Sequence, residues 1–363
     1  MTWEDLMTHP FTRGLTAVLL AVSALAATTA AVSAAPAVNN DPARNTLKIE
    51  LDQLTLAGRY GDIVARADAD LAKATRLPDG SWRGYETYIQ FERALMETRA
   101  GDDAFWNKLL TTLRQRAEKR PADVFLYVQA LHARAWLVRG GGYASHVPAS
   151  QRHSFRQLMD LARTALDKRS ATLAISPIWW AQRTTVANEL GEGSDKLSAL
   201  FEEGVRRFPD FHPLYLTRMR ALTPKWGGSE DAMLDLLDRI SAIDGPAREE
   251  GLYARAFWVA ENEGELVNLD PRFKKDAWRA AVDVIAARWA GVGNRQRFFM
   301  NGCELSDRTL AKAHVDAMDA PIVDELMQLN GGLIDSCRKW AASGEVFLMG
   351  VRYRGKDQHL LVQ

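Results

Sequence analysis

The sequence predicts an all-α protein, a tetratricopeptide-like α-solenoid of stacked helical hairpins. Helix-start signals recur along the chain, and a proline-and-aromatic pattern returns at a nearly regular interval. Strand-like alternation is scarce before the last residues. The 363 residues are 47% hydrophobic and 25% charged, which is enough apolar material to build a substantial core.

Three helix starts support this prediction locally. Ser176 before Pro177, and Asp270 before Pro271, each place a capping side chain ahead of a proline at the first helical position. Ser229 precedes two acidic residues, which suit the positive end of a helix dipole. Apolar residues then follow Pro271 at fourfold spacing and predict one buried helical face. They are Phe273, Ala277, Ala281, Ile285 and Trp289.

A repeated unit joins a proline to a leucine-tyrosine pair. The copies are Pro121 with Leu126 and Tyr127, Pro209 with Leu214 and Tyr215, and, with one more residue between, Pro246 with Leu252 and Tyr253. Aromatic landmarks step along the chain at close to the tetratricopeptide length: Tyr88, Tyr127, Trp180, Tyr215 and Tyr253. One hairpin cannot bury its own apolar face, so we expect stacked hairpins over residues 41–341.

Two glycine-rich loops interrupt the helices. The first contains Trp136, Arg139 and Gly140, and the second contains Pro224, Trp226, Gly227, Gly228 and Ser229. Glycine permits backbone angles that other residues resist, so we expect a structural brace. In it, Arg139 binds loop carbonyls or a carboxylate, and Trp226 covers the next helix. The alternative is a pair of loops that contact a ligand or partner.

These loops carry a family resemblance. The W-x-x-R-G loop at Trp136, the F-x-x-L stretch from Phe155 to Leu158 and the P-K-W-G-G-S run at Pro224 resemble domain-of-unknown-function family 4034, a bacterial family similar to tetratricopeptide proteins. The resemblance extends from about Leu54 to Ala341, and Lys225 stands where the family pattern has arginine. It implies helical architecture, and it implies no reaction and no catalytic residue.

The amino terminus resembles a secretory signal peptide over residues 1–37. An apolar run from Leu15 to Ala27 follows Arg13 and leads into small residues, with cleavage expected after Ala34 or Ala37. The acidic residues near Met1 raise the alternative that Met7 is the start. A second alternative is an uncleaved anchor over residues 14–35, long enough to cross a bilayer. Cleavage predicts a periplasmic or secreted protein, whereas the anchor predicts a single-pass membrane protein.

Two features near the carboxyl end complete the expected organisation. Cys303 and Cys337 are the only cysteines, and export would permit a disulfide between them, the alternative being two buried free thiols. The tail from 342 to 363 alternates apolar and polar residues around a turn at 355–357, which predicts a short β-hairpin.

Motifs of common enzymes are missing from the sequence. There is no G-x-S-x-G elbow, no H-E-x-x-H helix, no C-x-x-C and no G-x-G-x-x-G turn, so we expect no cofactor and no metal. His132, His146 and His153 are not spaced as a compact metal site and are interpreted as ordinary surface or core residues. Lysine plus arginine equal aspartate plus glutamate at 46 each, which argues against a nucleic-acid partner.

The function expected from these observations is binding. A helical-repeat scaffold in the cell envelope would hold a protein or peptide segment on its surface. The alternative is a cell-wall enzyme that cuts glycan with a carboxylate pair that no motif reveals. Arginine and aromatic residues around a groove would favour binding, and paired buried carboxylates in a cleft would favour catalysis.

Overall fold

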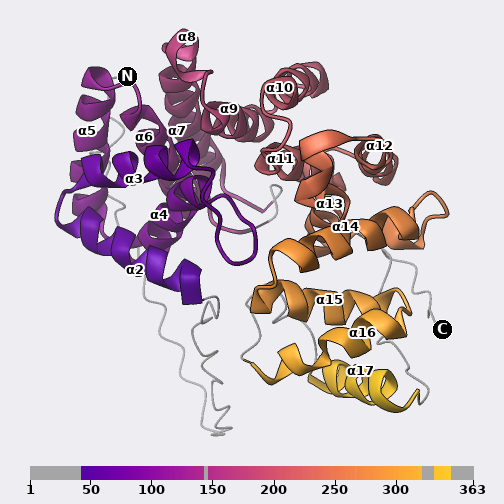
Figure 1. Cartoon of the computed structure of the whole chain (residues 1–363). Coiled ribbons are helices and arrows are strands. Elements are labelled where there is room, and N and C mark those ends of the chain that lie inside the picture. Colours follow the sequence, from indigo (N-terminus) through magenta and orange to yellow (C-terminus); the bar gives the residue numbers. More distant parts are fainter. Residues whose placement is uncertain (1–41, 143–145, 266, 321–330, 345–363) are drawn as a thin grey trace, which may run out of the picture. The chain divides into compact units, whose positions relative to one another are not determined.

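The computed structural model describes residues 42–142, 146–265, 267–320 and 331–344 (Figure 1). The predicted signal peptide and the predicted terminal β-hairpin lie outside these ranges. The α-helices are α2 (Pro42–Leu56), α3 (Tyr60–Ala72), α4 (Arg83–Arg99), α5 (Asp103–Lys119), α6 (Asp123–Arg139), α7 (Ala149–Asp167), α8 (Ser170–Leu173), α9 (Pro177–Leu190), α10 (Ser194–Arg207), α11 (Pro213–Ala221), α12 (Glu230–Ser241), α13 (Leu252–Asn262), α14 (Lys275–Arg288), α15 (Val292–Glu304), α16 (Arg308–His314) and α17 (Gly331–Ser343). Short 3-10 helices are η1 (Pro224–Trp226), η2 (Gly245–Glu250), η3 (Val267–Leu269) and η4 (Val315–Asp319).

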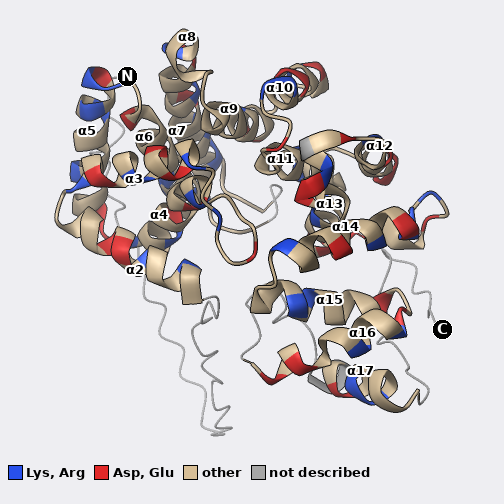
Figure 2. Cartoon of the chain, in the orientation of Figure 1, with Lys and Arg blue, Asp and Glu red and all other residues tan. Residues whose placement is uncertain are grey.

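The all-α prediction is confirmed. Within the described ranges the secondary structure is helical apart from an isolated β-bridge between Arg76 and Trp82. None of the helices in these ranges combines the length and the apolar character needed to cross a bilayer. Lysine and arginine are interspersed with aspartate and glutamate over the described helices (Figure 2), so charges of both signs are mixed along the fold.

The helices pack as successive hairpins in two layers. One layer runs α4, α6, α9, α11, α13, in which each helix contacts the next, while α5, α7, α10 and α12 pack against its members (Figure 1). The five aromatic landmarks fall one on each helix of the first layer, and all are buried. The repeat seen in the sequence therefore marks one helix of each stacked unit.

Helix α6 shows why the first layer is hard to recognise from amphipathic pattern. It packs against α4, α5, α7 and α9. Consequently every residue from Asp123 to Leu131 is buried. A helix covered on all sides needs no polar face, so an apolar stripe is absent from its sequence.

Two of the three predicted helix starts are confirmed. The Ser176 hydroxyl accepts a hydrogen bond from the backbone N–H of Ile178 at 3.3 Å, and the Ser229 hydroxyl accepts one from Ala232 at 3.2 Å. These bonds satisfy N–H groups that have no partner within the first helical turn. The side chains that cap α9 and α12 therefore bind N–H groups only two or three positions along the chain, so these caps are recognisable from the sequence.

The third predicted start, at Asp270, is wrong, because α14 begins at Lys275. The Asp270 carboxylate accepts from the backbone N–H of Arg272 and makes a turn before the helix. The N–H of Lys274 donates to the Tyr253 hydroxyl at 2.8 Å, and Phe273 packs against Tyr253 with ring centroids 5.7 Å apart. These tertiary contacts hold the segment outside the helix.

The loop between α3 and α4 binds helices far along the chain. The Arg76 guanidinium donates to both carboxylate oxygens of Glu250, at 2.8 and 3.1 Å. The carbonyl of Asp79 accepts from Arg255 at 3.0 Å and from Asn294 at 3.1 Å. The loop comprising residues 73–82 therefore joins the first helices to the segment around α13 and α15.

Gly80 permits this close approach. Its φ is +86°, a conformation that other residues rarely adopt, and an added Cβ would lie 2.4 Å from the Trp289 ring. Arg255 also lies over that ring, with its Cζ 5.1 Å from the ring centroid. Trp289, predicted on the apolar face of α14, instead follows the last helical residue and packs against this loop.

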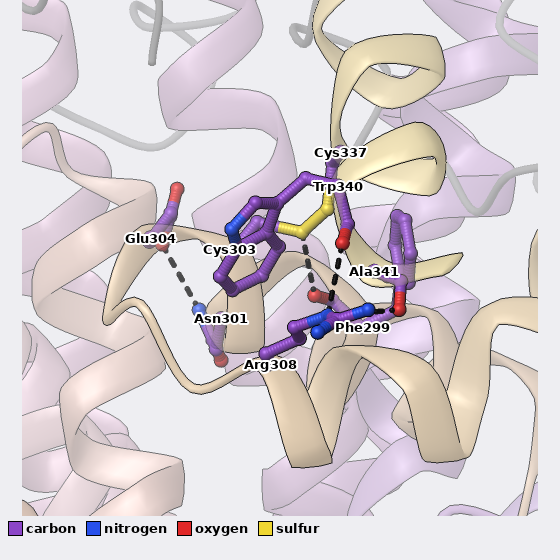
Figure 3. The surroundings of a disulfide bond; sticks show 8 residues. All are labelled: Phe299, Asn301, Cys303, Glu304, Arg308, Cys337, Trp340 and Ala341. Atoms are coloured by element: carbon purple, nitrogen blue, oxygen red, sulfur yellow. Dashed lines mark hydrogen bonds between the residues drawn. A yellow bond between two sulfur atoms is a disulfide. The ribbon is translucent and has the colours of Figure 1, made fainter. Parts of the chain in front are cut away.

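Cys303 and Cys337 are joined as a disulfide in the structure, with Cα atoms 6.0 Å apart (Figure 3). The bond links α15 to α17 within a small apolar cluster. Beside it, the Arg308 side chain donates to the Trp340 and Ala342 carbonyls, both at 3.1 Å, and holds the end of α17 against α16. The last described helix is thus fastened covalently and by hydrogen bonds.

We expect replacement of both cysteines by serine to lower the free energy of unfolding by about 3 to 4 kcal/mol, because the bond closes a loop of 34 positions in the unfolded chain. Chemical denaturation of the two proteins measures the difference. Thiol labelling of the denatured wild type without reductant should modify no cysteine, and labelling after reduction should modify both. Two modified cysteines before reduction would contradict the bond.

Candidate functional site

The two predicted glycine-rich loops lie in contact. The Trp136 and Trp226 ring centroids are 6.0 Å apart with an edge-to-face angle of 79°. Arg139 covers the Trp136 ring, with its Cζ 4.8 Å from the ring centroid. The Arg139 guanidinium also donates to the carbonyls of Gly140 at 2.9 Å and Gly142 at 3.2 Å. The sequence singled out both loops, but their contact is a tertiary feature.

The second loop has a backbone that depends on its glycines. Pro224 begins the 3-10 turn η1, and Gly227 ends it with a φ of +87°. A Cβ on Gly228 would lie 1.9 Å from the carbonyl oxygen of Leu222, so another residue there would shift the backbone. Ser229 then caps α12. The proline, the two glycines and the serine therefore determine the backbone of this turn. This turn holds Trp226 against Trp136.

A cavity of about 350 Å³ lies beside Trp226. Its walls come from α4, α6, α9 and α11, four successive helices of the first layer, together with η1. The lining residues are Tyr85, Ile89, Glu92, Arg93, Met96, Val128, Gln129, His132, Gln182, Thr185, Val186, Asn188, Glu189, Thr217, Arg220 and Trp226. The volume falls within the range of small-ligand pockets, near its lower end.

His132 joins two carboxylates in this cavity. Its Nδ1 lies 2.7 Å from Glu92 Oε1, and its Nε2 lies 2.9 Å from Glu189 Oε1. The indole N–H of Trp136 donates to Glu189 Oε1 at 3.0 Å. Three stacked helices, α4, α6 and α9, are therefore linked through one imidazole, and the first glycine-rich loop is tied to the same carboxylate through Trp136.

The surroundings of His132 favour its charged form. Burial alone would lower its pKa, but the charges and hydrogen bonds of Glu189 and Glu92 outweigh burial and hold the pKa of His132 well above its ordinary value of 6.5. His132 is thus an imidazolium between two carboxylates at neutral pH. The interpretation of His132 as an ordinary residue missed this bridge, since Glu92 and Glu189 lie 40 and 57 positions away in the sequence.

Two glutamines extend the hydrogen-bonded network. The Gln129 amide donates to Glu92 Oε2, and the Gln182 amide donates to Gln129 Oε1 at 2.9 Å and to the Phe125 carbonyl at 3.0 Å. Three buried atoms in the lining have no hydrogen-bond partner: Glu189 Oε2, Gln182 Oε1 and Trp226 Nε1. Such atoms are uncommon in buried positions.

The other predicted positions lie elsewhere. His153 is exposed on α7, and the disulfide of Cys303 and Cys337 belongs to the separate cluster around α15 to α17. Lys225, beside Trp226, forms an ion pair with Glu263, which also lies 3.5 Å from Arg220. This pair attaches the second loop to the end of α13.

Comparisons with protein-family models, curated proteins and solved structures find no match to this chain. The resemblance of the two loops to domain-of-unknown-function family 4034 stays a prediction.

We expect Trp226→Ala to lower the free energy of unfolding by about 2 kcal/mol, roughly half the cost for a fully buried tryptophan, because Trp226 is only half-buried. A fully buried tryptophan would cost about 3 to 5 kcal/mol. Arg139→Ala should cost less than about 1 kcal/mol, since the carbonyls it binds are exposed and water can replace it. Urea denaturation checks both, and a larger loss for Arg139→Ala would contradict the ranking.

Proposed function

We propose that this protein is an exported helical-repeat scaffold of the cell envelope whose cavity anchors a segment of a protein or peptide partner. The supporting observation is a cavity of about 350 Å³, built across four stacked helices and lined by aromatic, aliphatic and polar side chains. Binding sites of this kind are mostly apolar and carry a few polar groups that orient the ligand. Arg93 and Arg220 lie at its exposed edge, where they can meet polar groups of the segment.

The competing proposal, a glycan-cutting enzyme, has a carboxylate pair in Glu92 and Glu189. Catalysis by such a pair requires one carboxyl group as acid and the other as base or nucleophile. Both oxygens of Glu92 already bind His132 and Gln129, and only one oxygen of Glu189 is unpaired. The arrangement therefore suits an electrostatic binding site better than acid–base catalysis.

The location in the envelope rests on the signal-like leader, and we expect it to be removed. Intact-mass analysis of protein purified from the envelope fraction of its native cells should give an amino terminus at Ala35 or Val38. The full leader on protein from the soluble cytoplasmic fraction would contradict export. A full leader on membrane-bound protein would instead support the anchored alternative.

Photocrosslinking tests the binding proposal directly. A photoreactive amino acid at Thr217, which lines the cavity, should give a discrete protein or peptide adduct in native cells. The same group at Asp244, which is 89% exposed and outside the cavity, is the matched control and should give none. Equal adducts from both positions would contradict specific binding. Release of soluble glycan fragments by the purified protein, lost in Glu189→Gln, would support the enzyme instead.

A further inference from the structure

We infer that the loop over residues 73–82, here called the strap, holds the cavity closed between α4 and α11 and releases it in acid. This inference rests on the proposed function and names a regulation of that same cavity. It is carried by the contacts that join the strap to the start of α11, by the position of those contacts beside the cavity, and by a buried histidine among them.

Helices α4 and α11 meet beside the cavity, although α6 and α9 lie between them in the first layer. The Tyr85 hydroxyl of α4 is hydrogen-bonded to the Thr217 side chain of α11, and both residues line the cavity. The Tyr85 ring also packs edge to face on Phe211, just before α11, with ring centroids 5.8 Å apart. Contact between α4 and α11 therefore bounds the cavity, and separation of these helices would widen it.

The strap is joined to the start of α11 by two parallel sets of contacts. In the first, Trp82 packs against Phe211 with ring centroids 5.2 Å apart. In the second, Arg76 donates to both carboxylate oxygens of Glu250, and Glu250 Oε2 lies 3.0 Å from His212 Nδ1. Trp82 directly precedes α4 and His212 directly precedes α11. These contacts therefore set the spacing of the two helices.

Much of the attachment of the strap to other helices is polar. The Asp79 carbonyl accepts hydrogen bonds from Arg255 of α13 and Asn294 of α15. The Asp79 carboxylate forms an ion pair with Arg44 of α2 at 2.5 Å. Ionic contacts depend on protonation, whereas the stacked helices are held together by apolar cores. A proton can therefore release the strap locally while the helices stay folded.

His212 lies at the centre of these charges and is 3% exposed. Its Nδ1–H donates to Glu250, so an added proton would go to Nε2. Such a proton would place a positive charge in a buried site that already holds several guanidinium groups. The charged groups facing His212 are Arg76 and Asp79 of the strap, Arg44 of α2, Glu250 of η2 and Arg255 of α13, while Asp210 and Arg288 act on Arg76 in turn.

The direction of the pH effect follows from two opposed groups. Burial and the charges of Arg255 and Arg76 hold the pKa of His212 well below 6.5 while the strap is closed, and opening restores its ordinary pKa. The open form therefore gains a proton as the pH falls through 6.5, so acid favours opening. Burial raises the pKa of Glu250 above 4.5, which favours the closed form, but this effect acts mainly at lower pH.

Hydrogen exchange of the wild-type protein tests acid release. The amides of Leu77 and Gly80 are hydrogen-bonded within the strap. Between about pH 7.5 and about pH 5.5 we expect their protection factors to fall by up to about tenfold, the effect of one histidine that titrates only in the open form. Amides of α7 are the control and should keep their protection, since the helices stay folded. Constant or rising protection of the strap in acid would overturn the inference.

Substitution assigns the effect to His212. His212→Asn retains a side chain that can donate to Glu250 but does not titrate, so it should remove the pH dependence of strap protection. His153→Asn is the matched control, because His153 is exposed, and it should behave like the wild type. Wild-type pH dependence in His212→Asn would overturn the role of His212. The wild-type measurement decides acid release even where this variant fails to fold.

Thiol labelling tests whether the strap controls the cavity. Thr185 lines the cavity and its hydroxyl donates to the Ala181 carbonyl within α9, so Thr185→Cys leaves the contacts between α4 and α11 in place. Asp244→Cys, exposed and outside the cavity, supplies the effect of pH on the thiol reaction itself. The ratio of the two maleimide labelling rates should rise by up to about tenfold over the same fall in pH. A constant ratio would overturn control of the cavity by the strap.

Photocrosslinking and thiol labelling separate the two proposals. An adduct from Thr217 with a constant labelling ratio leaves partner binding standing and overturns the strap inference. Acid-dependent labelling of Thr185→Cys without any adduct from Thr217 supports the strap and overturns partner binding. An adduct together with acid-dependent exchange and labelling is the result expected.

Discussion

Replacement of His132 by leucine is expected to lower the free energy of unfolding by about 3 to 5 kcal/mol, the cost of removing one member of a buried ion pair. The reason is that Glu92 and Glu189 would remain in the protein interior without the cation between them. His153→Leu is the matched control, since His153 is exposed, and it should change stability by less than about 0.5 kcal/mol. Urea denaturation of the three proteins measures both effects.

The contribution of His132 should also depend on pH with a defined sign. Its pKa in the folded protein is raised above the ordinary value of 6.5 that applies to the unfolded chain. The stabilisation is therefore complete below that value and is lost as the pH rises through the raised pKa of the folded protein. We expect the difference between wild type and His132→Leu to be largest at about pH 6 and to shrink in alkaline buffer. A difference that grows with pH would contradict the imidazolium bridge.

Replacement of Glu250 by alanine is expected to cost about 3 to 5 kcal/mol as well. The Glu250 side chain is 5% exposed, receives two hydrogen bonds from Arg76 and lies 3.0 Å from His212 Nδ1. Burial, together with the charges of Arg255 and Arg76, keeps the pKa of His212 well below its ordinary value, so His212 is a neutral donor to this carboxylate. Without Glu250, the partly buried Arg76 guanidinium loses its carboxylate.

The neighbouring residue provides the control for this prediction. Glu249 also pairs with an arginine, Arg288, but its side chain is 68% exposed, and Glu249→Ala should cost less than about 1 kcal/mol. Hydrogen exchange should report the same contrast locally. The amide of Gly80 in the loop over residues 73–82 should exchange faster in Glu250→Ala and unchanged in Glu249→Ala. Equal exchange in both variants would show that the ion pair does not hold the loop.

The local part of the fold could be predicted because its causes are local. Ser176 and Ser229 cap helices through bonds to residues two or three positions away, and the tyrosines at 127, 215 and 253 mark helices of one layer. The start at Asp270 could not be predicted, because Tyr253 and Phe273 hold that segment through contacts distant in sequence. Capping signals describe what a segment can do alone, and tertiary packing can override them.

The candidate site divides in the same way. The glycine-rich loops with Trp136 and Trp226 stood out in the sequence, because positive φ angles and tight turns require particular residue types. Glu92 and Glu189 did not stand out, because each is one glutamate on a helical surface with no neighbouring motif. Their role arises only when α4, α6 and α9 pack and His132 comes within hydrogen-bonding distance of both.

By itself, then, the amino-acid sequence determined an all-helical chain of stacked hairpins, two of the three proposed caps, and the glycine-dependent turns, all of which follow from short-range backbone and capping energetics. It also supplied the only two cysteines, which the fold brings within bonding distance. The tertiary structure alone decided which charges lose their water and which partners they meet. Charge pairing and desolvation depend on distance in space, so the imidazolium bridge and the loop bound at Glu250 emerge only in the folded protein.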